Sequence, residues 1–137
     1  MAKAAAPREV AARWTPDLVK EGWTPISDFF LRNYHRLDIS STEAILIVHL
    51  MSHKWDSQHP YPGFKSLAER MGVGATQIRS HARKLQMNGL LKREFRTGTT
   101  NRFDLTPLFR RLEALRVADR AAKEEAPPLP EVETVTV

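Results

Sequence analysis

The chain has 137 residues, 42% of them hydrophobic and 27% charged, which fits one globular domain with extensions rather than two domains. It contains no cysteine, and this excludes disulfides, thiolate metal sites and cysteine nucleophiles. The 21 basic residues outnumber the 16 acidic ones, and the resulting formal charge of +5 favours a polyanionic partner.

The excess positive charge lies in the middle of the chain. Residues 64–106 carry nine basic and three acidic side chains, whereas residues 1–63 carry seven of each and residues 107–137 carry five and six. The longest apolar run, residues 44–48, is much shorter than the roughly 20 residues needed to span a bilayer. No apolar segment of signal-peptide length follows the first residues. We therefore expect a cytoplasmic protein with no membrane partner.

Two Trp-Thr-Pro triplets, residues 14–16 and 23–25, mark the N-terminal part of the chain. In each, a threonine that can cap a helix precedes a proline suited to the first helical position, so we expect a helix to start at each triplet. Residues 1–12 are rich in alanine with mixed charges, and we expect them to be mobile. We assign residues 1–23 to an N-terminal extension, whose tryptophans either anchor a partner or cap the core.

A capping box, Ser40 followed by Glu43, predicts the start of a helix that ends near Trp55. Apolar residues cover most of its circumference, which is typical of a central core helix. Residues 56–63 contain two prolines and a glycine and are expected to form a loop.

Residues 64–91 have the pattern of two short helices around a tight turn. Gly72 ends the first helix, residues 64–71, and Gly89 ends the second, residues 75–88. The apolar positions of the two helices, each on one face, are Leu67, Ala68, Met71, Ile78, Ala82 and Leu85. This is a helix-turn-helix arrangement.

The outward face of helix 75–88 has the residue types that read DNA. A rotation of about 100° per residue places Thr76, Ser80 and Arg83 opposite the apolar stripe. Arg79 flanks them on one side, with Gln77 and Lys84 on the other, and the face has no acid. Arginine can donate two hydrogen bonds to guanine, glutamine can form two hydrogen bonds with adenine, and hydroxyl groups can bond to phosphates or bases. The alternative is an ordinary solvated helix face.

Two β-prone runs around a glycine-containing turn follow, and they predict a hairpin over residues 92–103. Arginines and threonines near its tip are suited to contacting a phosphate backbone or entering a minor groove. The complete set of predicted DNA-binding residues is Lys65, Ser66, Thr76, Gln77, Arg79, Ser80, Arg83, Lys84, Arg96, Thr99, Asn101 and Arg102.

Residues 67–91, followed by residues 101–108, resemble the winged helix-turn-helix domains of bacterial, plasmid and phage transcription regulators and replication-initiation proteins. Residues 25–55 are similar to the helical lead-in of the replication-associated branch. The resemblance implies a mainly α fold with a small β-hairpin, in which helix 75–88 is the recognition helix and residues 92–103 are the wing. The chain departs from the family at Gly74, where a capping Ser or Thr is usual, and at Ala82, where a larger aliphatic residue is common.

A last helix is predicted from Thr106, with an apolar stripe of Leu108, Leu112 and Leu115. It either covers the core or pairs with its copy in a homodimer. We place the winged helix-turn-helix domain and this helix in residues 24–122, and a flexible Pro-rich tail in residues 123–137.

No motif of catalysis or cofactor binding occurs. His49 and His53 stand four residues apart, but no cysteine or carboxylate at ligand spacing accompanies them. We therefore expect no enzyme activity, no metal and no cofactor. The predicted function is binding of double-stranded DNA in transcription regulation or replication initiation, on the nucleoid, together with a replication or transcription protein. The alternative is a winged-helix assembly module that recruits a protein partner through its wing and tail.

Overall fold

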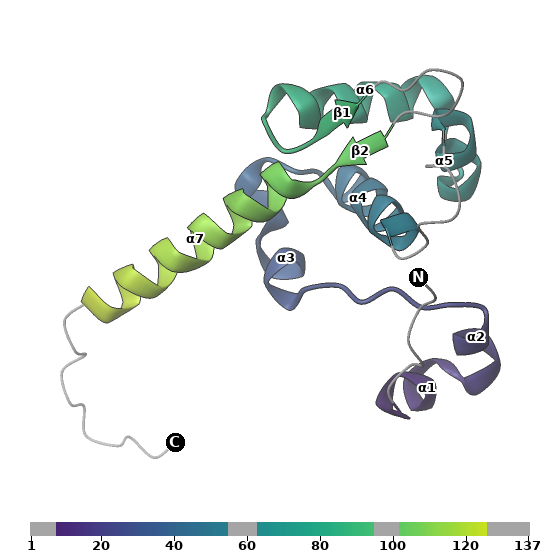
Figure 1. Ribbon diagram of the computed structural model, residues 1–137, viewed down its shortest axis with the longest axis horizontal. Helices are drawn as coiled ribbons and strands as arrows, with labels where there is room; N and C mark the ends of the chain where they lie inside the picture. Colours follow the sequence, from purple (N-terminus) through teal and green to yellow (C-terminus); the bar gives the residue numbers. More distant parts are fainter. Residues whose placement is uncertain (1–7, 55–62, 95–101, 126–137) are drawn as a thin grey trace, which may run out of the picture.

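The computed structural model describes residues 8–54, 63–94 and 102–125 (Figure 1). This part of the chain is mainly helical, with one small antiparallel hairpin. Its elements are α1 (Arg8–Trp14), α2 (Pro16–Lys20), α3 (Asp28–Asn33), the 3-10 helix η1 (Tyr34–Leu37), α4 (Ser41–Lys54), α5 (Phe64–Met71), α6 (Ala75–Met87), β1 (Lys92–Glu94), β2 (Arg102–Asp104) and α7 (Thr106–Glu125).

The N-terminal helices correct two expectations. Residues 8–12, expected to be mobile, belong to helix α1. Thr15 caps α2 as predicted, with its Oγ1 accepting the Leu18 N–H at 3.2 Å, but no helix starts at Thr24. Instead Ser27 caps α3, because its hydroxyl accepts the Phe30 N–H at 3.3 Å and an acidic residue follows in the first turn. In Figure 1, α1 and α2 stand apart from the other helices.

Helix α4 is the central core helix, as its apolar circumference predicts. Leu46, Ile47 and Leu50 are each at most 2% exposed, and α5 and α6 pack against this helix. The buried side chains that α5 and α6 contribute are Leu67, Ala68, Ile78, Ala82 and Leu85, all of them predicted apolar positions. The core therefore lies between α4 and the pair α5–α6.

The turn between α5 and α6 depends on a left-handed glycine. Gly72 has a φ of 68°, a conformation that glycine adopts without steric cost. The following Val73 N–H donates to the Ala68 carbonyl at 3.0 Å and closes the end of α5. Helix α6 then starts after Gly74, which offers no side-chain cap.

The hairpin follows α6 directly. In its register Lys92 faces Asp104, Arg93 faces Phe103 and Glu94 faces Arg102. Phe103 is 6% exposed, so one face of the hairpin packs onto the core. The predicted tip residues Arg96, Thr99 and Asn101 lie outside the residues that the structure describes.

Helix α7 covers the core with its first turns and then extends away from it (Figure 1). Leu108 is 1% exposed, and Leu112 packs against the core, so the covering role predicted for this helix is confirmed. Farther along, the Arg36 guanidinium donates to both carboxylate oxygens of Asp119, at 2.7 and 2.9 Å, and ties α7 to η1. The helix continues to Glu125, three residues beyond its predicted end. Within the described ranges, no helix is both long and apolar enough to cross a membrane.

Ile78→Ala should lower the free energy of unfolding by about 2–5 kcal/mol, because it leaves a cavity in the core between α4 and α6. Ile78 is fully buried. The matched control is Ile45→Ala on α4, where the isoleucine is 50% exposed and the expected loss is below about 1 kcal/mol. Urea unfolding of both variants measures the difference, and equal losses would show that the core is not where the structure places it.

Candidate nucleic-acid interface

The outward face of α6 is polar, basic and exposed. Helix α6 carries two arginines, a lysine and a histidine but no acidic residue. The predicted DNA-binding residues of α5 and α6 that lie exposed are Lys65, Ser66, Thr76, Gln77, Arg79, Ser80 and Arg83. The apolar stripe of α6 is buried on the opposite side. The rotation expected from the sequence is therefore confirmed, and the contact of these residues with DNA stays a prediction.

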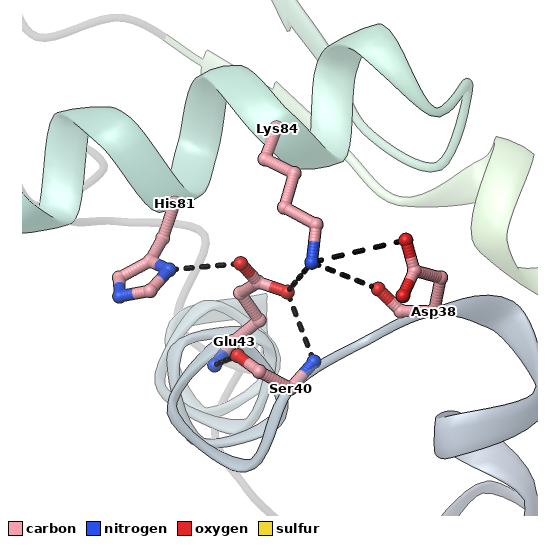
Figure 2. Close-up of polar contacts among 5 residues, drawn as sticks. All are labelled: Asp38, Ser40, Glu43, His81 and Lys84. Carbon is pink, nitrogen blue, oxygen red and sulfur yellow. Dashed lines mark hydrogen bonds and ion pairs between the residues drawn. The ribbon is translucent and has the colours of Figure 1, made fainter.

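Lys84 differs from the other predicted residues because its side chain reaches toward the start of α4. Its ammonium donates to Oε1 of Glu43 at 3.0 Å and to the backbone carbonyl of Asp38 at 3.1 Å. The Asp38 carboxylate lies 4.0 Å away. Figure 2 shows the side chain descending from α6 between these two acids. Lys84 thus joins two segments of the protein and does not extend the outward face.

Glu43 accepts hydrogen bonds from α6 and from its own helix start (Figure 2). The Ser40 N–H donates to Oε1 at 2.9 Å, and the Ser40 hydroxyl accepts the Glu43 N–H at 3.1 Å, so the predicted capping box is confirmed. Oε2 lies 2.8 Å from Nδ1 of His81. Because an ionised carboxylate only accepts hydrogen bonds, this His81 nitrogen carries the proton. The Glu43 side chain is only 2% exposed, and three donors satisfy it.

These donors keep Glu43 ionised despite its burial. Burial alone would raise the pKa of the carboxyl group, but the hydrogen bonds from Ser40, His81 and Lys84 and the charge of Lys84 outweigh it and lower the pKa to about 2. The hydrogen bond to Glu43 in turn raises the pKa of Lys84. The pair is therefore charged throughout the neutral pH range.

A second cluster joins α5, α6 and the hairpin. Phe64, the first residue of α5, lies with its ring centroid 5.9 Å from that of Phe103. The guanidinium carbon of Arg79 lies 5.8 Å from the Phe64 ring centroid, and that of Arg93 lies 4.8 Å from it. Sequence reasoning missed Phe64 and Arg93, because the hairpin register that turns Arg93 toward α5 is not readable from the sequence. Arg102, on the other strand, is exposed and 4.0 Å from Glu94.

The histidines of α4 do not gather with other metal ligands in the part of the chain that the structure describes. No group of three or more histidine or acidic side chains there could hold a metal ion. His49 is partly buried, and burial, assisted by the charge of Arg70, lowers its pKa. It is therefore a neutral side chain packed on a core helix.

The sequence that forms α3 to α7 matches a known family. The profile of the DnaD N-terminal domain matches residues 26–124. The chain belongs to the DnaD N-terminal domain family. The match includes every element from α3 onward and leaves α1 and α2 outside.

The fold is also similar to a solved member of this family. It superimposes on the crystal structure of the N-terminal domain of DnaD protein from Geobacillus kaustophilus HTA426 with a TM-score of 0.66 and 22% sequence identity. The similarity covers 88% of this chain and 100% of the other. At this identity it shows the fold alone. Comparison with curated proteins gives no match.

Glu43→Gln should destabilise the protein much more at neutral pH than in acid. The folded pKa of about 2 lies below the ordinary value of 4.5, so the ionised group contributes stability above pH 4.5 that is lost as the pH falls toward 2. We expect a loss of roughly 2–3 kcal/mol near neutrality, falling below about 1 kcal/mol at about pH 2.5.

Urea unfolding across this pH range measures the effect. Glu113→Gln, at an exposed carboxylate paired with Arg116 on α7, is the matched control and should change stability little. A Glu43→Gln loss that is the same at neutral and acid pH would contradict the assigned role of the Glu43 charge.

Proposed function

We propose that this chain is a winged helix-turn-helix module that binds double-stranded DNA in replication initiation, with no catalytic step and no cofactor. Membership of the DnaD N-terminal domain family suggests a role in replication initiation or assembly, and it therefore favours replication over transcription control. The element order supports the winged-helix interpretation. Helices α4, α5 and α6 share one core, and the β1–β2 hairpin follows α6 at once.

The charge distribution around α6 is the observation that carries the DNA-binding proposal. The outward face is basic and has no acid of its own. Glu43, the acid that contacts α6 from α4, is buried and paired with Lys84 and His81. Its negative charge is therefore compensated within the protein and does not oppose an approaching phosphate backbone.

The exposed residues of α5, α6 and the hairpin would make two kinds of contact with DNA. Thr76, Gln77, Ser80 and Arg83 face outward along α6 and would meet base edges if α6 enters the major groove. Three exposed residues near the start of α5 and in the hairpin would contact the phosphate backbone: Lys65, Ser66 and Arg102. Arg96, Thr99 and Asn101 remain proposed wing contacts on sequence grounds.

Fluorescence anisotropy with a mixed library of genomic duplexes tests the proposal. The unaltered protein should retain a subset of sequences at physiological salt, with an affinity that falls steeply as salt rises. Arg83→Ala should lose about 1–3 kcal/mol of discrimination between bound and unbound sequences.

The control for this titration is Arg32→Ala, which removes an equal charge from an exposed position on α3. It should bind like the unaltered protein. Weak binding of all duplexes alike, abolished by physiological salt in every variant, would refute sequence-specific DNA recognition by α6.

Assembly with a protein partner or a second copy is the other candidate function. Its support is the apolar surface of the N-terminal extension, where Trp14 is 66% exposed and Leu18 is 56% exposed. Helix α2 has no buried residue, and both helices stand apart from the body in Figure 1. The two side chains come from α1 and α2, which contact each other, and exposed apolar side chains on neighbouring elements are typical of interaction surfaces.

Sedimentation velocity tests self-association through this extension. The unaltered protein should sediment as a dimer or larger species at high concentration, and a Trp14→Ser, Leu18→Ser double variant should sediment as a monomer. Val117→Ser, at a 52% exposed position on α7, is the control. A double variant that associates like the unaltered protein would exclude the extension as the contact.

A further inference from the structure

The ring of His81 has one nitrogen inside the fold and one in contact with solvent. Nδ1 lies 2.8 Å from Oε2 of Glu43, whose side chain is only 2% exposed. Because this carboxylate is ionised, Nδ1 carries a proton and donates it. Nε2 forms no hydrogen bond within the described ranges and is not shut off from water. Figure 2 shows it directed away from Glu43. Glu43 thus fixes the ring and leaves Nε2 available to a ligand.

His81 lies at the edge of the outward face of α6. At about 100° per residue, its side chain points between the buried stripe, which includes Ile78 and Leu85, and the flank that carries the exposed Gln77. A helix about 10–12 Å across fills a major groove that is roughly 12 Å wide. The centre of its outward face then meets the bases, and its flanks meet the two sugar-phosphate strands that wall the groove. The place of His81 therefore suits a phosphate better than a base edge.

A proton on Nε2 would change the charge at this edge by one unit. The charged groups nearest the ring are Glu43 and, three residues farther along α6, Lys84, whose ammonium lies 3.0 Å from Oε1 of Glu43. Asp38, in the turn before α4, lies 4.0 Å from that ammonium. In the part of the chain that the structure describes, α5 included, no other charged side chain forms an ion pair or hydrogen bond with the ring. Histidine is the side chain that gains or loses a proton between roughly pH 5 and pH 8.

We propose that His81 is a proton-linked contact to a backbone phosphate of duplex DNA. The inference rests on the proposed function. On binding, Nε2 takes up a proton from solvent and donates it in a charge-assisted hydrogen bond to a phosphate oxygen, while Nδ1 stays bonded to Glu43. The complex then holds more protons than its separate parts, so the affinity rises as the pH falls. Sequence reasoning missed this residue, because the acid that fixes its ring is 38 residues away in the chain.

The pH dependence of binding tests the contact. On a duplex that the unaltered protein retains, the affinity at fixed salt should be about tenfold higher at pH 6 than at pH 8. The slope of log affinity against log salt should be steeper by about 0.9 at pH 6, because one more phosphate is neutralised. His81→Gln removes the titrating ring and should show neither change. His35→Gln, at an exposed histidine of η1, is the matched control and should behave like the unaltered protein.

Two further measurements identify the groups that meet. In the unaltered protein, the NMR signals of the His81 ring should titrate at a higher pH in the complex than in the free chain. In a series of duplexes that each carry one uncharged methylphosphonate in place of a phosphate, at least one should bind without pH dependence. Thermal unfolding of both variants at pH 6 and pH 8 measures any loss of packing.

Each result supports or overturns the contact. Equal affinity at the two pH values, with an unchanged titration of the His81 ring, would overturn the contact and leave the proposed function standing. A pH dependence that survives His81→Gln would place the titrating group elsewhere. The same pH dependence for every methylphosphonate duplex would rule out a phosphate as the partner of Nε2. No binding by the unaltered protein at either pH would overturn the contact and the proposed function together.

Discussion

A buried carboxylate joins the start of α4 to α6. Taking an ionised group out of water is costly unless it is paired and hydrogen-bonded, and Glu43 meets this requirement with donors from Ser40, His81 and Lys84. Two of the donors lie on α6, three residues apart, so they fix the rotation of that helix about its axis. Removing any one donor would leave a buried charge partly unsatisfied.

The fixed rotation decides what α6 presents to solvent. With His81 and Lys84 turned to Glu43, and with Ile78 in the core, the remaining polar side chains of the helix face outward. The same contact pairs the positive charge of Lys84 with the negative charge of the buried Glu43. The basic outward face therefore results from how charges are paired inside the fold as much as from the composition of α6. The Phe64 cluster continues this basic region toward the hairpin.

Local patterns predict much of this arrangement, and long-range contacts account for the rest. The two residues of the capping box, Ser40 and Glu43, are three positions apart, and the buried stripe of α6 follows helical periodicity, so both are readable from the sequence. The partner of Lys84 is 41 residues away in the chain, and no local pattern indicates it. The position of Arg93 depends on a hairpin register that is fixed only when Phe103 packs into the core. At Thr24 the local pattern predicts a helix start that does not form. The helix starts three residues later, where Ser27 caps it.

An NMR titration of the ¹⁵N-labelled chain with a duplex that it retains tests most directly whether α6 is the surface that meets DNA. If α6 meets DNA, amide and arginine side-chain signals should shift along the outward face of α6 and in β1 and β2, and the amides of α1, α2 and the second half of α7 should stay unchanged. Shifts confined to α1, α2 or α7, with α6 unaffected at saturating duplex, would contradict the claim that α6 is the surface that meets DNA.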